Sequence, residues 1–95
     1  MKTVSYHEEA IRELTDAKDS SDEPEAFDGD VFDVLELLML GGVRSARIGR
    51  TDARQWIMDR LPYSIIYVDG DESIRIIAFA HHKRKPGYWR KRLQS

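Results

Sequence analysis

The sequence has no cysteine and only three prolines among its 95 residues. The lack of cysteine excludes a disulfide framework, a thiolate metal site and a cysteine nucleophile. The first ten residues hold no apolar run typical of a signal peptide, and no stretch is long enough to span a bilayer. We therefore expect a cytoplasmic protein without membrane contact. A chain of this length forms a single domain, residues 1–95, with one modest core.

Each half of the chain is poor in charge of one sign. Residues 1–40 hold three basic and twelve acidic residues, and residues 41–95 hold twelve basic and five acidic ones, so a net charge of −2 conceals halves of −9 and +7. Residues 81–95 include six Lys or Arg and no acid. One explanation of this charge split is that two solvated faces of the protein attract each other. The split also gives the second half a positive field suited to nucleic acid or an acidic peptide.

The stretch 61–89 predicts a β-hairpin. Strands Tyr63–Val68 and Ile74–Ala80 flank an acidic turn that contains Asp69-Gly70, and the Asp-Gly pair supplies the positive φ that a tight turn needs. Both strands are apolar at consecutive positions, which is typical of strands covered on both faces. Strict alternation places residues 74, 76, 78 and 80 opposite residues 77 and 79.

The remaining elements follow from periodicity. Residues 2–6 predict a short edge strand, a helix begins at His7–Glu9 and continues to about Lys18, and a second helix runs from Pro24 or Asp28 to Leu40 and ends at Gly41-Gly42. Residues 54–60 predict a strand that completes a three-stranded antiparallel meander. The expected fold is α+β, in the order β-α-α-β-β-β, with a helical hairpin on one sheet face. The other face and a short basic C-terminal tail are expected to be open, with residues 88–93 either extended or in one helical turn.

The second half of the chain holds an ordered set of short motifs. They are Ile48-Gly49-Arg50, Arg54, Pro62–Tyr67 (PYSIIY), Ile74–Ala78 (IRIIA) and His81–Arg84 (HHKR), followed by Pro86, Tyr88 and Trp89. No single motif is diagnostic, but with the ordered set the second half resembles toxins of the RelE/ParE superfamily from bacterial type II toxin–antitoxin modules. The first half agrees only in kind, as a strand followed by two amphipathic helices.

The resemblance implies one of two activities. RelE-like members cleave mRNA on the ribosome with arginines, lysines and a tyrosine or histidine, whereas ParE-like members inhibit DNA gyrase by binding. Position 64 carries a serine where the RelE-like pattern has an arginine. A cleavage centre needs a cation where charge develops on the phosphate, so Ser64 favours the ParE-like branch. A degenerate, non-toxic member that only binds antitoxin is the third reading. The resemblance further implies a cognate antitoxin partner, contact with operator DNA only through that antitoxin, and no cofactor.

If the chain is a ribonuclease, its candidate catalytic residues are Arg54, His81, Arg84 and Tyr88. A histidine that titrates near neutral pH is suited to proton transfer from a 2′-hydroxyl. The simpler reading is that one of His81 and His82 caps the strand while the other is solvated. Adjacent strand residues point to opposite faces and no third ligand is suitably spaced, so no metal site is expected.

Cations and aromatic residues near the C-terminus form the candidate surface for the target or the antitoxin. Phosphate-neutralising cations beside stacking rings are typical of nucleic-acid contacts, although Trp89 is equally compatible with packing onto the sheet. Arg44 and Arg47 extend this basic character ahead of the meander. The candidate binding residues are Arg50, Arg54, Lys83, Arg84, Tyr88, Trp89, Arg90 and Arg92.

Overall fold

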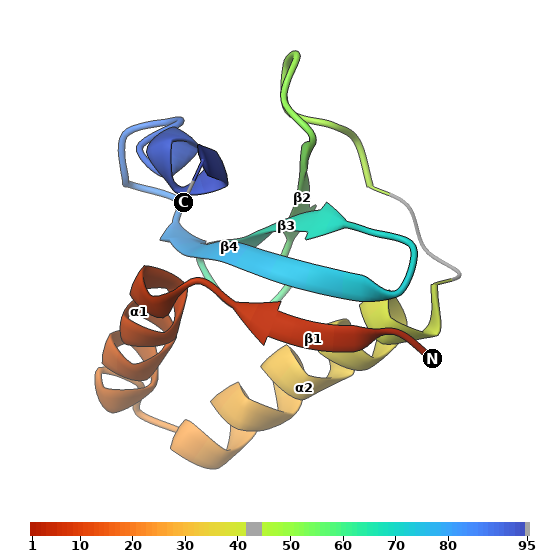
Figure 1. Cartoon of the computed structure of the whole chain (residues 1–95). Coiled ribbons are helices and arrows are strands. Elements are labelled where there is room, and N and C mark those ends of the chain that lie inside the picture. Colours follow the sequence, from red (N-terminus) through yellow and green to blue (C-terminus); the bar gives the residue numbers. More distant parts are fainter. Residues whose placement is uncertain (42–44, 95) are drawn as a thin grey trace.

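The fold is a four-stranded sheet with two helices on one face (Figure 1), seen in a computed structural model that describes residues 1–41 and 45–94. Arg44, one of the cations named above, and Gly42 lie outside the described residues. The elements in chain order are β1 (Thr3–Tyr6), α1 (Glu8–Asp19), α2 (Pro24–Leu40), β2 (Ala53–Ile57), β3 (Tyr63–Asp69), β4 (Ser73–His81) and a 3₁₀ helix, η1 (Arg90–Gln94).

The strand order is β1-β4-β3-β2, so β1 is an edge strand as predicted. Strands β2, β3 and β4 pair antiparallel as a meander, while β1 runs parallel to β4 over Thr3–Tyr6. A parallel neighbour of β4 requires a crossover, and the two helices supply it. The α+β fold and its β-α-α-β-β-β order are thus confirmed.

Local sequence explains where both helices begin and end. The His7 side chain accepts a hydrogen bond from the Glu9 N–H and caps α1, whose acidic first turn suits the positive end of the helix dipole. Pro24 starts α2 at a position where its missing N–H costs nothing. Gly41 ends α2 in the left-handed conformation with φ of 75°, which is the residue and geometry expected at a helix C-terminus.

The main core lies between the helices and the sheet, as the apolar stripe of α2 predicts. Phe27 of α2 contacts Phe79 of β4 edge-to-face with ring centroids 5.7 Å apart, and Tyr63 stacks on Phe79 at 4.5 Å. Aromatic pairs in these geometries add to the free energy gained from burial alone. The buried members of this core are Ala10, Ala17, Phe27, Val31, Val34, Leu38, Met58, Ile65, Tyr67, Ile74, Ile76 and Phe79.

A β-bulge in β4 overturns the strict alternation expected for that strand. The register against β3 shifts between Ile66 and Tyr67: Ile66 pairs with Ala78, but Tyr67 pairs with Ile76, so Ile77 is the extra residue. A bulge places two residues of one strand opposite one of its partner and re-aims the residues beyond it. Ala78 therefore lies on the same face as Ile77, not with Ile76.

The expectation that the second sheet face is open was wrong. A second cluster of buried residues covers part of it: Ala53, Ile66, Ile77, Ala78 and Trp89. Figure 1 shows the C-terminal segment with η1 on the side of the sheet away from the helices. Trp89 is only 3% exposed, because its large apolar ring gains most by packing onto the otherwise bare strands. The described residues thus form two apolar clusters where a single core was expected.

Strand β2 ends earlier than predicted. The expected strand spanned residues 54–60, whereas β2 covers Ala53–Ile57. Residues 58–62 form the short connection that returns the chain into β3, although the Met58 N–H still donates to the Tyr63 carbonyl at 3.1 Å. Met58 remains buried in the main core. Met58 is apolar because it is buried in the core, and not because the strand continues beyond Ile57.

Replacing Trp89 with alanine should destabilise the protein. Truncating a buried tryptophan removes its apolar contacts and leaves a cavity, which costs about 3–5 kcal/mol. Urea unfolding of Trp89→Ala beside Lys91→Ala measures this. Lys91 is an exposed residue of the same segment, so its substitution should stay within about 0.5 kcal/mol of the wild type. Equal stabilities of the two variants would mean that the C-terminal segment does not form part of the core.

Candidate functional site

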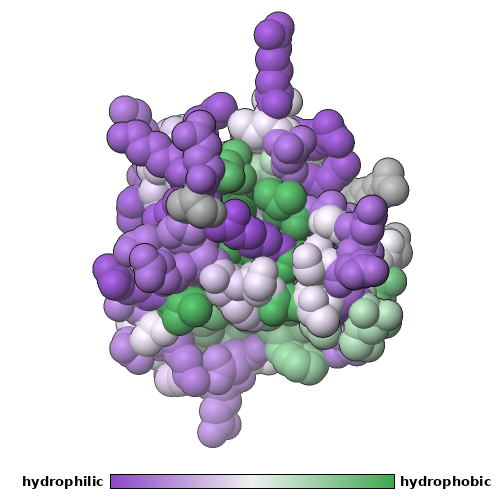
Figure 2. Space-filling model, viewed as in Figure 1, coloured by the Kyte–Doolittle hydropathy of each residue, from purple (hydrophilic) through white to green (hydrophobic). Residues whose placement is uncertain are grey.

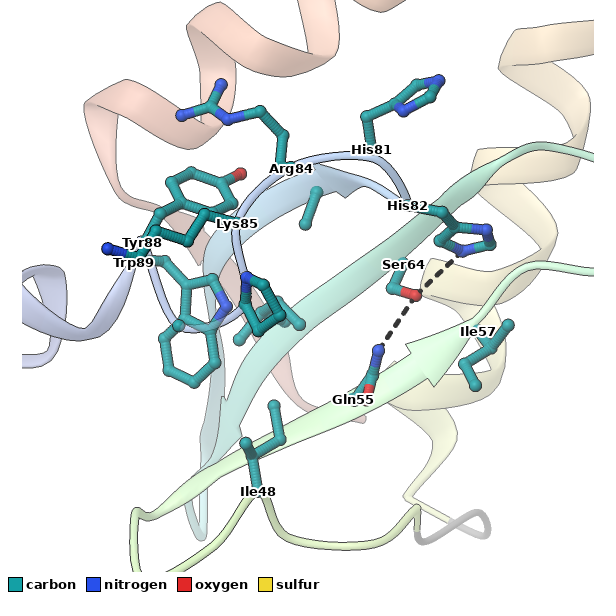
Figure 3. Close-up of a pocket in the computed structure, with 14 residues that line it drawn as sticks. Ile48, Gln55, Ile57, Ser64, His81, His82, Arg84, Lys85, Tyr88 and Trp89 are labelled. Carbon is teal, nitrogen blue, oxygen red and sulfur yellow. Dashed lines mark hydrogen bonds between the residues drawn. The ribbon is translucent and has the colours of Figure 1, made fainter.

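A groove of about 450 Å³ lies on the second sheet face, between strands β2–β4 and the segment that follows β4 (Figure 3). Ser64 and Ile66 of β3 form its floor, and residues 84–89 form one wall. None of its lining residues is acidic. They are Ile48, Gln55, Ile57, Ser64, Ile66, Ala80, His81, His82, Arg84, Lys85, Pro86, Gly87, Tyr88 and Trp89.

Three polar side chains meet at the floor of the groove. Gln55 Nε2 donates to Ser64 Oγ at 3.2 Å, and Ser64 Oγ lies 3.2 Å from His82 Nε2. Figure 3 shows Gln55 and His82 pointing at Ser64 from opposite sides. Ser64 is 1% exposed. The Ser64 hydroxyl carries one proton and two lone pairs, so it can accept from Gln55 and either donate to or accept from His82 Nε2.

The two adjacent histidines have separate environments. The His81 ring lies edge-on to Tyr63, with centroids 4.9 Å apart, and its Nδ1 accepts the Lys83 N–H at 3.0 Å. His81 therefore caps the end of β4, in agreement with the simpler reading of the sequence. His82 instead reaches Ser64 in the groove. The bulge at Ile77 determines which residues of β4 face the groove, since it shifts every later position by one.

Glu13 of α1 holds the wall of the groove in place. Its carboxylate accepts the Tyr88 hydroxyl at 2.6 Å and both terminal nitrogens of Arg92 at 2.7 and 3.2 Å. Oε1 also accepts the Phe79 N–H at 3.2 Å. The Glu13 and Arg92 side chains are each 14% exposed. A paired and fully hydrogen-bonded charge pair can be retained at such low exposure, whereas either partner alone is costly to bury.

The same pair completes the edge of the sheet. Strand β1 pairs only with residues 73–76 of β4, so the remainder of that β4 edge has no strand beside it. The Phe79 N–H there donates to Glu13, and the Ile77 carbonyl accepts from Arg92 at 3.1 Å. Side chains thus supply the hydrogen bonds that a longer β1 would have made.

The two aromatic residues of the C-terminal segment either contact arginines of the same segment or are buried. The Arg84 guanidinium lies 4.0 Å from the centroid of Tyr88, and that of Arg92 lies 5.1 Å from it. Trp89 is buried, with Arg90 at 5.8 Å from its ring centroid. The cations and rings that the sequence placed side by side are therefore largely satisfied by one another.

Gly87 allows this packing at the turn before η1. Its φ is 77°, and a Cβ added there would lie 2.7 Å from Arg90 Nε. A side chain would thus be both strained by the left-handed backbone and in collision with Arg90. The Arg90 guanidinium also passes near Gly49, whose Cβ position is 3.9 Å from Arg90 Nη2. Arg90 consequently lies near one end of the groove, between two chain segments.

The structure brings three of the four residues of the ribonuclease hypothesis, His81, Arg84 and Tyr88, to one groove but places the fourth, Arg54, elsewhere. Arg54 pairs with Tyr67 across the strands and so faces the helices, where Nη1 donates to the Ser45 carbonyl at 2.6 Å. His81 is the cap of β4, and the Tyr88 hydroxyl is bound to Glu13. Arg84 points away from Ser64 in Figure 3. Of the predicted binding residues, Arg50, Lys83, Arg84 and Arg90 are exposed, whereas Arg54, Tyr88, Trp89 and Arg92 are engaged internally.

Sequence reasoning missed three residues of this site. Gln55 and Ile57 lie in the strand expected over residues 54–60, and Glu13 lies in the first expected helix, but none of the three was a predicted site residue. The alternation of β2 does place Gln55 and Ile57 together on the face opposite Trp56, which is a usable signal. Glu13 carries no signal of its own, because its partner Arg92 lies 79 residues away in the sequence.

The described residues form neither a cluster that could hold a metal ion nor a helix that could cross a membrane. Within residues 1–41 and 45–94, no three His, Asp or Glu side chains come together in a way that could hold a metal ion. Neither α1 nor α2 has the combination of length and apolar character needed to cross a membrane.

The Tyr88–Glu13 contact makes stability depend on pH in the alkaline range. Burial, together with the hydrogen bond to Glu13 and its negative charge, raises the pKa of Tyr88. A raised pKa means that the folded state favours the neutral phenol. The contribution of Tyr88 to the free energy of unfolding is therefore full below the pKa of an unfolded tyrosine, about 10. It is lost as the pH rises beyond that value.

Tyr88→Phe should therefore cost stability near neutral pH but progressively less above about pH 10. The loss at neutral pH should be near the lower end of the roughly 1.5–3 kcal/mol typical of a hydrogen bond to a charged group. Urea unfolding of both proteins from pH 7 to 11 gives the difference in free energy at each pH. Tyr6, whose pKa is also raised by burial, contributes equally to both and cancels. A difference that stays constant to pH 11 would contradict the contact.

Comparison with known proteins identifies a structural relative. No protein-family model and no curated protein matches the sequence. Among solved structures, the chain is similar to one from the "Chromosomal ParDE TA system from P. aeruginosa", with a TM-score of 0.60 and 20% sequence identity. The match covers 85% of this chain and 96% of that one. The chain therefore shares the fold of a component of a ParDE toxin–antitoxin system.

Proposed function

We propose that this protein is the toxin of a bacterial type II toxin–antitoxin module, of the ParE-like kind, which inhibits DNA gyrase by binding and is neutralised by a cognate antitoxin. The observation that carries the proposal is the shared fold with a chain of the ParDE system, which covers nearly all of that chain. The motifs of the second half, from Ile48 to Trp89, point to the same superfamily independently of the structure. As in that superfamily, the protein acts in the cytoplasm and reaches operator DNA only through its antitoxin.

The site supports binding in preference to RNA cleavage. Phosphodiester cleavage needs cations and a proton carrier that converge on one phosphate. Here the floor of the groove carries the neutral side chains of Ser64 and Gln55 beside His82. Arg54 faces the helices, and the Tyr88 hydroxyl is bound to Glu13. Arg84 and Lys85 line the groove, but Arg84 points away from Ser64 and no arginine or lysine contacts that residue among the described side chains. The groove is therefore better suited to holding another macromolecule than to breaking its backbone.

Purified protein should inhibit ATP-dependent supercoiling by DNA gyrase, and addition of the product of the adjacent open reading frame should restore it. Induced expression should arrest growth with loss of supercoiling and a DNA damage response. Site-specific mRNA cleavage in ribosomes without an effect on gyrase would favour the RelE-like alternative. No growth arrest, with tight binding to the neighbouring gene product, would favour the non-toxic alternative. Either result would overturn the proposal.

The exposed cations at the C-terminal end provide a mutational test. Arg84→Ala combined with Arg90→Ala should abolish growth arrest and leave the fold intact, because both side chains are exposed and neither is part of the Glu13 contact. Arg12→Ala combined with Arg60→Ala is the matched control, since it removes the same charge from exposed sites on α1 and after β2. Growth arrest after induction measures toxicity, and circular dichroism reports the fold. Full toxicity of the Arg84/Arg90 variant would remove this surface from the mechanism.

A further inference from the structure

Strand β1 forms an open edge of the sheet. Its one neighbour among the described strands is β4, and Figure 1 shows β1 in front of the other strands. The backbone N–H groups of Thr3 and His7 donate toward β4. Because backbone groups alternate in direction along a strand, those of Val4 and Tyr6 point outward. Each of these two residues therefore offers one donor and one acceptor to another strand.

The edge has none of the features that usually prevent strand addition. Natural edge strands are protected by an outward lysine, a proline, a bulge or a covering segment. Residues 3–6 include no proline and no charge, and they pair with β4 in continuous register. The nearest cation, Lys2, is turned inward, since its Nζ lies 2.5 Å from Asp69 Oδ1. Strand β1 is thus open to pairing with another chain.

Helix α2 runs beside β1 in the opposite direction. The Lys2 N–H donates to the Met39 carbonyl at 3.0 Å, so the start of β1 lies near the end of the helix. Tyr6 lines a small cavity together with Val31 and Leu35, so the end of β1 lies near the middle of the helix. The open edge and α2 consequently form one continuous surface.

This surface carries most of the exposed large apolar side chains. Seven such side chains are found among the described residues, and five of them belong to α2 or to residues 1–6: Met1, Tyr6, Phe32, Leu37 and Leu40. Figure 2, drawn in the same view as Figure 1, shows weakly hydrophilic and apolar residues over β1, with strongly hydrophilic side chains on either side. Apolar surface with a polar rim is typical of a protein interface.

The edge is complementary to a second copy of itself. Two β1 strands that pair antiparallel about Ser5 place Val4 of each copy opposite Tyr6 of the other. These are the residues with outward backbone groups, so each of the two pairs exchanges two hydrogen bonds. The rotation axis is perpendicular to the sheet, which keeps both helical hairpins on one face and brings the two α2 helices toward each other. A contact of this kind closes at two subunits.

From these observations we infer that the protein forms a two-fold symmetric homodimer, in which β1 pairs with β1 of a second copy and the exposed apolar residues of α2 pack beside that junction. A second copy fits the edge better than an unrelated strand, because pairing about Ser5 satisfies all of its outward groups at once. The inference does not rest on the proposed function, and either can fail without the other.

Charge opposes this dimer and distinguishes it from other modes of association. Asp33 and Glu36 are exposed on α2 beside the apolar residues, and residues 1–40 have twelve acidic and three basic residues, a net charge of −9. Raising the salt concentration from about 0.1 to about 1 M shortens the screening length from about 10 to about 3 Å. Salt should therefore tighten the dimer, whereas it would weaken a head-to-tail contact between the acidic half and the basic half.

Sedimentation equilibrium of the full chain measures the dimer and its dissociation constant. Ser5→Asp should weaken the dimer about tenfold or more, because the two added charges lie directly opposite each other. Thr15→Asp is the matched control, since it adds the same charge at an exposed site of α1. Phe32→Asp should also weaken the dimer, whereas Ile57→Asp on β2 should not, although the two wild-type side chains are 62% and 61% exposed.

A cross-link tests the register without relying on charged variants. The chain has no cysteine, so Ser5→Cys introduces a single thiol at the rotation axis. Opposite residues of a non-hydrogen-bonded antiparallel pair have Cα atoms about 4.5 Å apart, which a disulfide can span. Mild oxidation should convert Ser5→Cys into a covalent dimer and leave Thr15→Cys largely monomeric.

Several outcomes would overturn the inference. A wild-type protein that stays monomeric up to about 1 mM, or a dimer that weakens as salt is added, would exclude this interface. A dimer lost in Ile57→Asp but kept in Ser5→Asp would lie on the β2 edge instead. Equal cross-linking of Ser5→Cys and Thr15→Cys would show random collision. A monomer whose binding to the adjacent gene product is weakened by Ser5→Asp would assign the edge to that partner.

Discussion

The carboxylate of Glu13 is the contact on which the arrangement of the second sheet face depends. It ties α1 to β4 through the Phe79 N–H and to the C-terminal segment through Tyr88 and Arg92. Trp89 is carried between those two side chains and packs onto the strands. The wall of the groove is thus anchored by Glu13, a helix residue that is distant in the sequence from the segment it holds. Loss of that carboxylate would leave Arg92 poorly paired at low exposure, which is costly.

This contact pairs some of the opposite charges of the two halves of the chain. The acidic half contributes Glu13 and the basic half contributes Arg92, so some of the late cations serve to close the fold. Arg50, Lys83, Arg84, Lys85 and Arg90 remain exposed around the groove. Exposed ion pairs add little to stability, so folding alone is a weak reason for the excess of cations on this surface. The apolar side chain of Ile57 is also exposed there.

Much of the fold was predictable because local signals and long-range packing agree. The hairpin of β3 and β4, the periodicity of α2 and Gly41 were each encoded within a few residues. The positive φ expected of Gly70 in the turn was wrong, since Gly70 is not among the described glycines with φ above zero. The bulge at Ile77 was not predictable, because β4 is apolar at every position around it and no period reveals the extra residue. Ser64 stood out in the sequence only because it replaces the arginine of the RelE-like pattern, and its place at the floor of the groove was not predicted. The site was not predictable at Glu13, whose partners are brought near only by the folded chain.

The bulge has a consequence for how related chains are compared. Deleting the one extra residue at position 77 would turn every later side chain of β4 to the opposite face of the sheet. His81 and His82 would then exchange neighbours. Relatives that differ only in this insertion would then present different members of a His-His pair to the same surface. Matching such chains by strand pattern alone would equate the histidine that caps β4 with the one that contacts Ser64, so the alignment must follow the bulge.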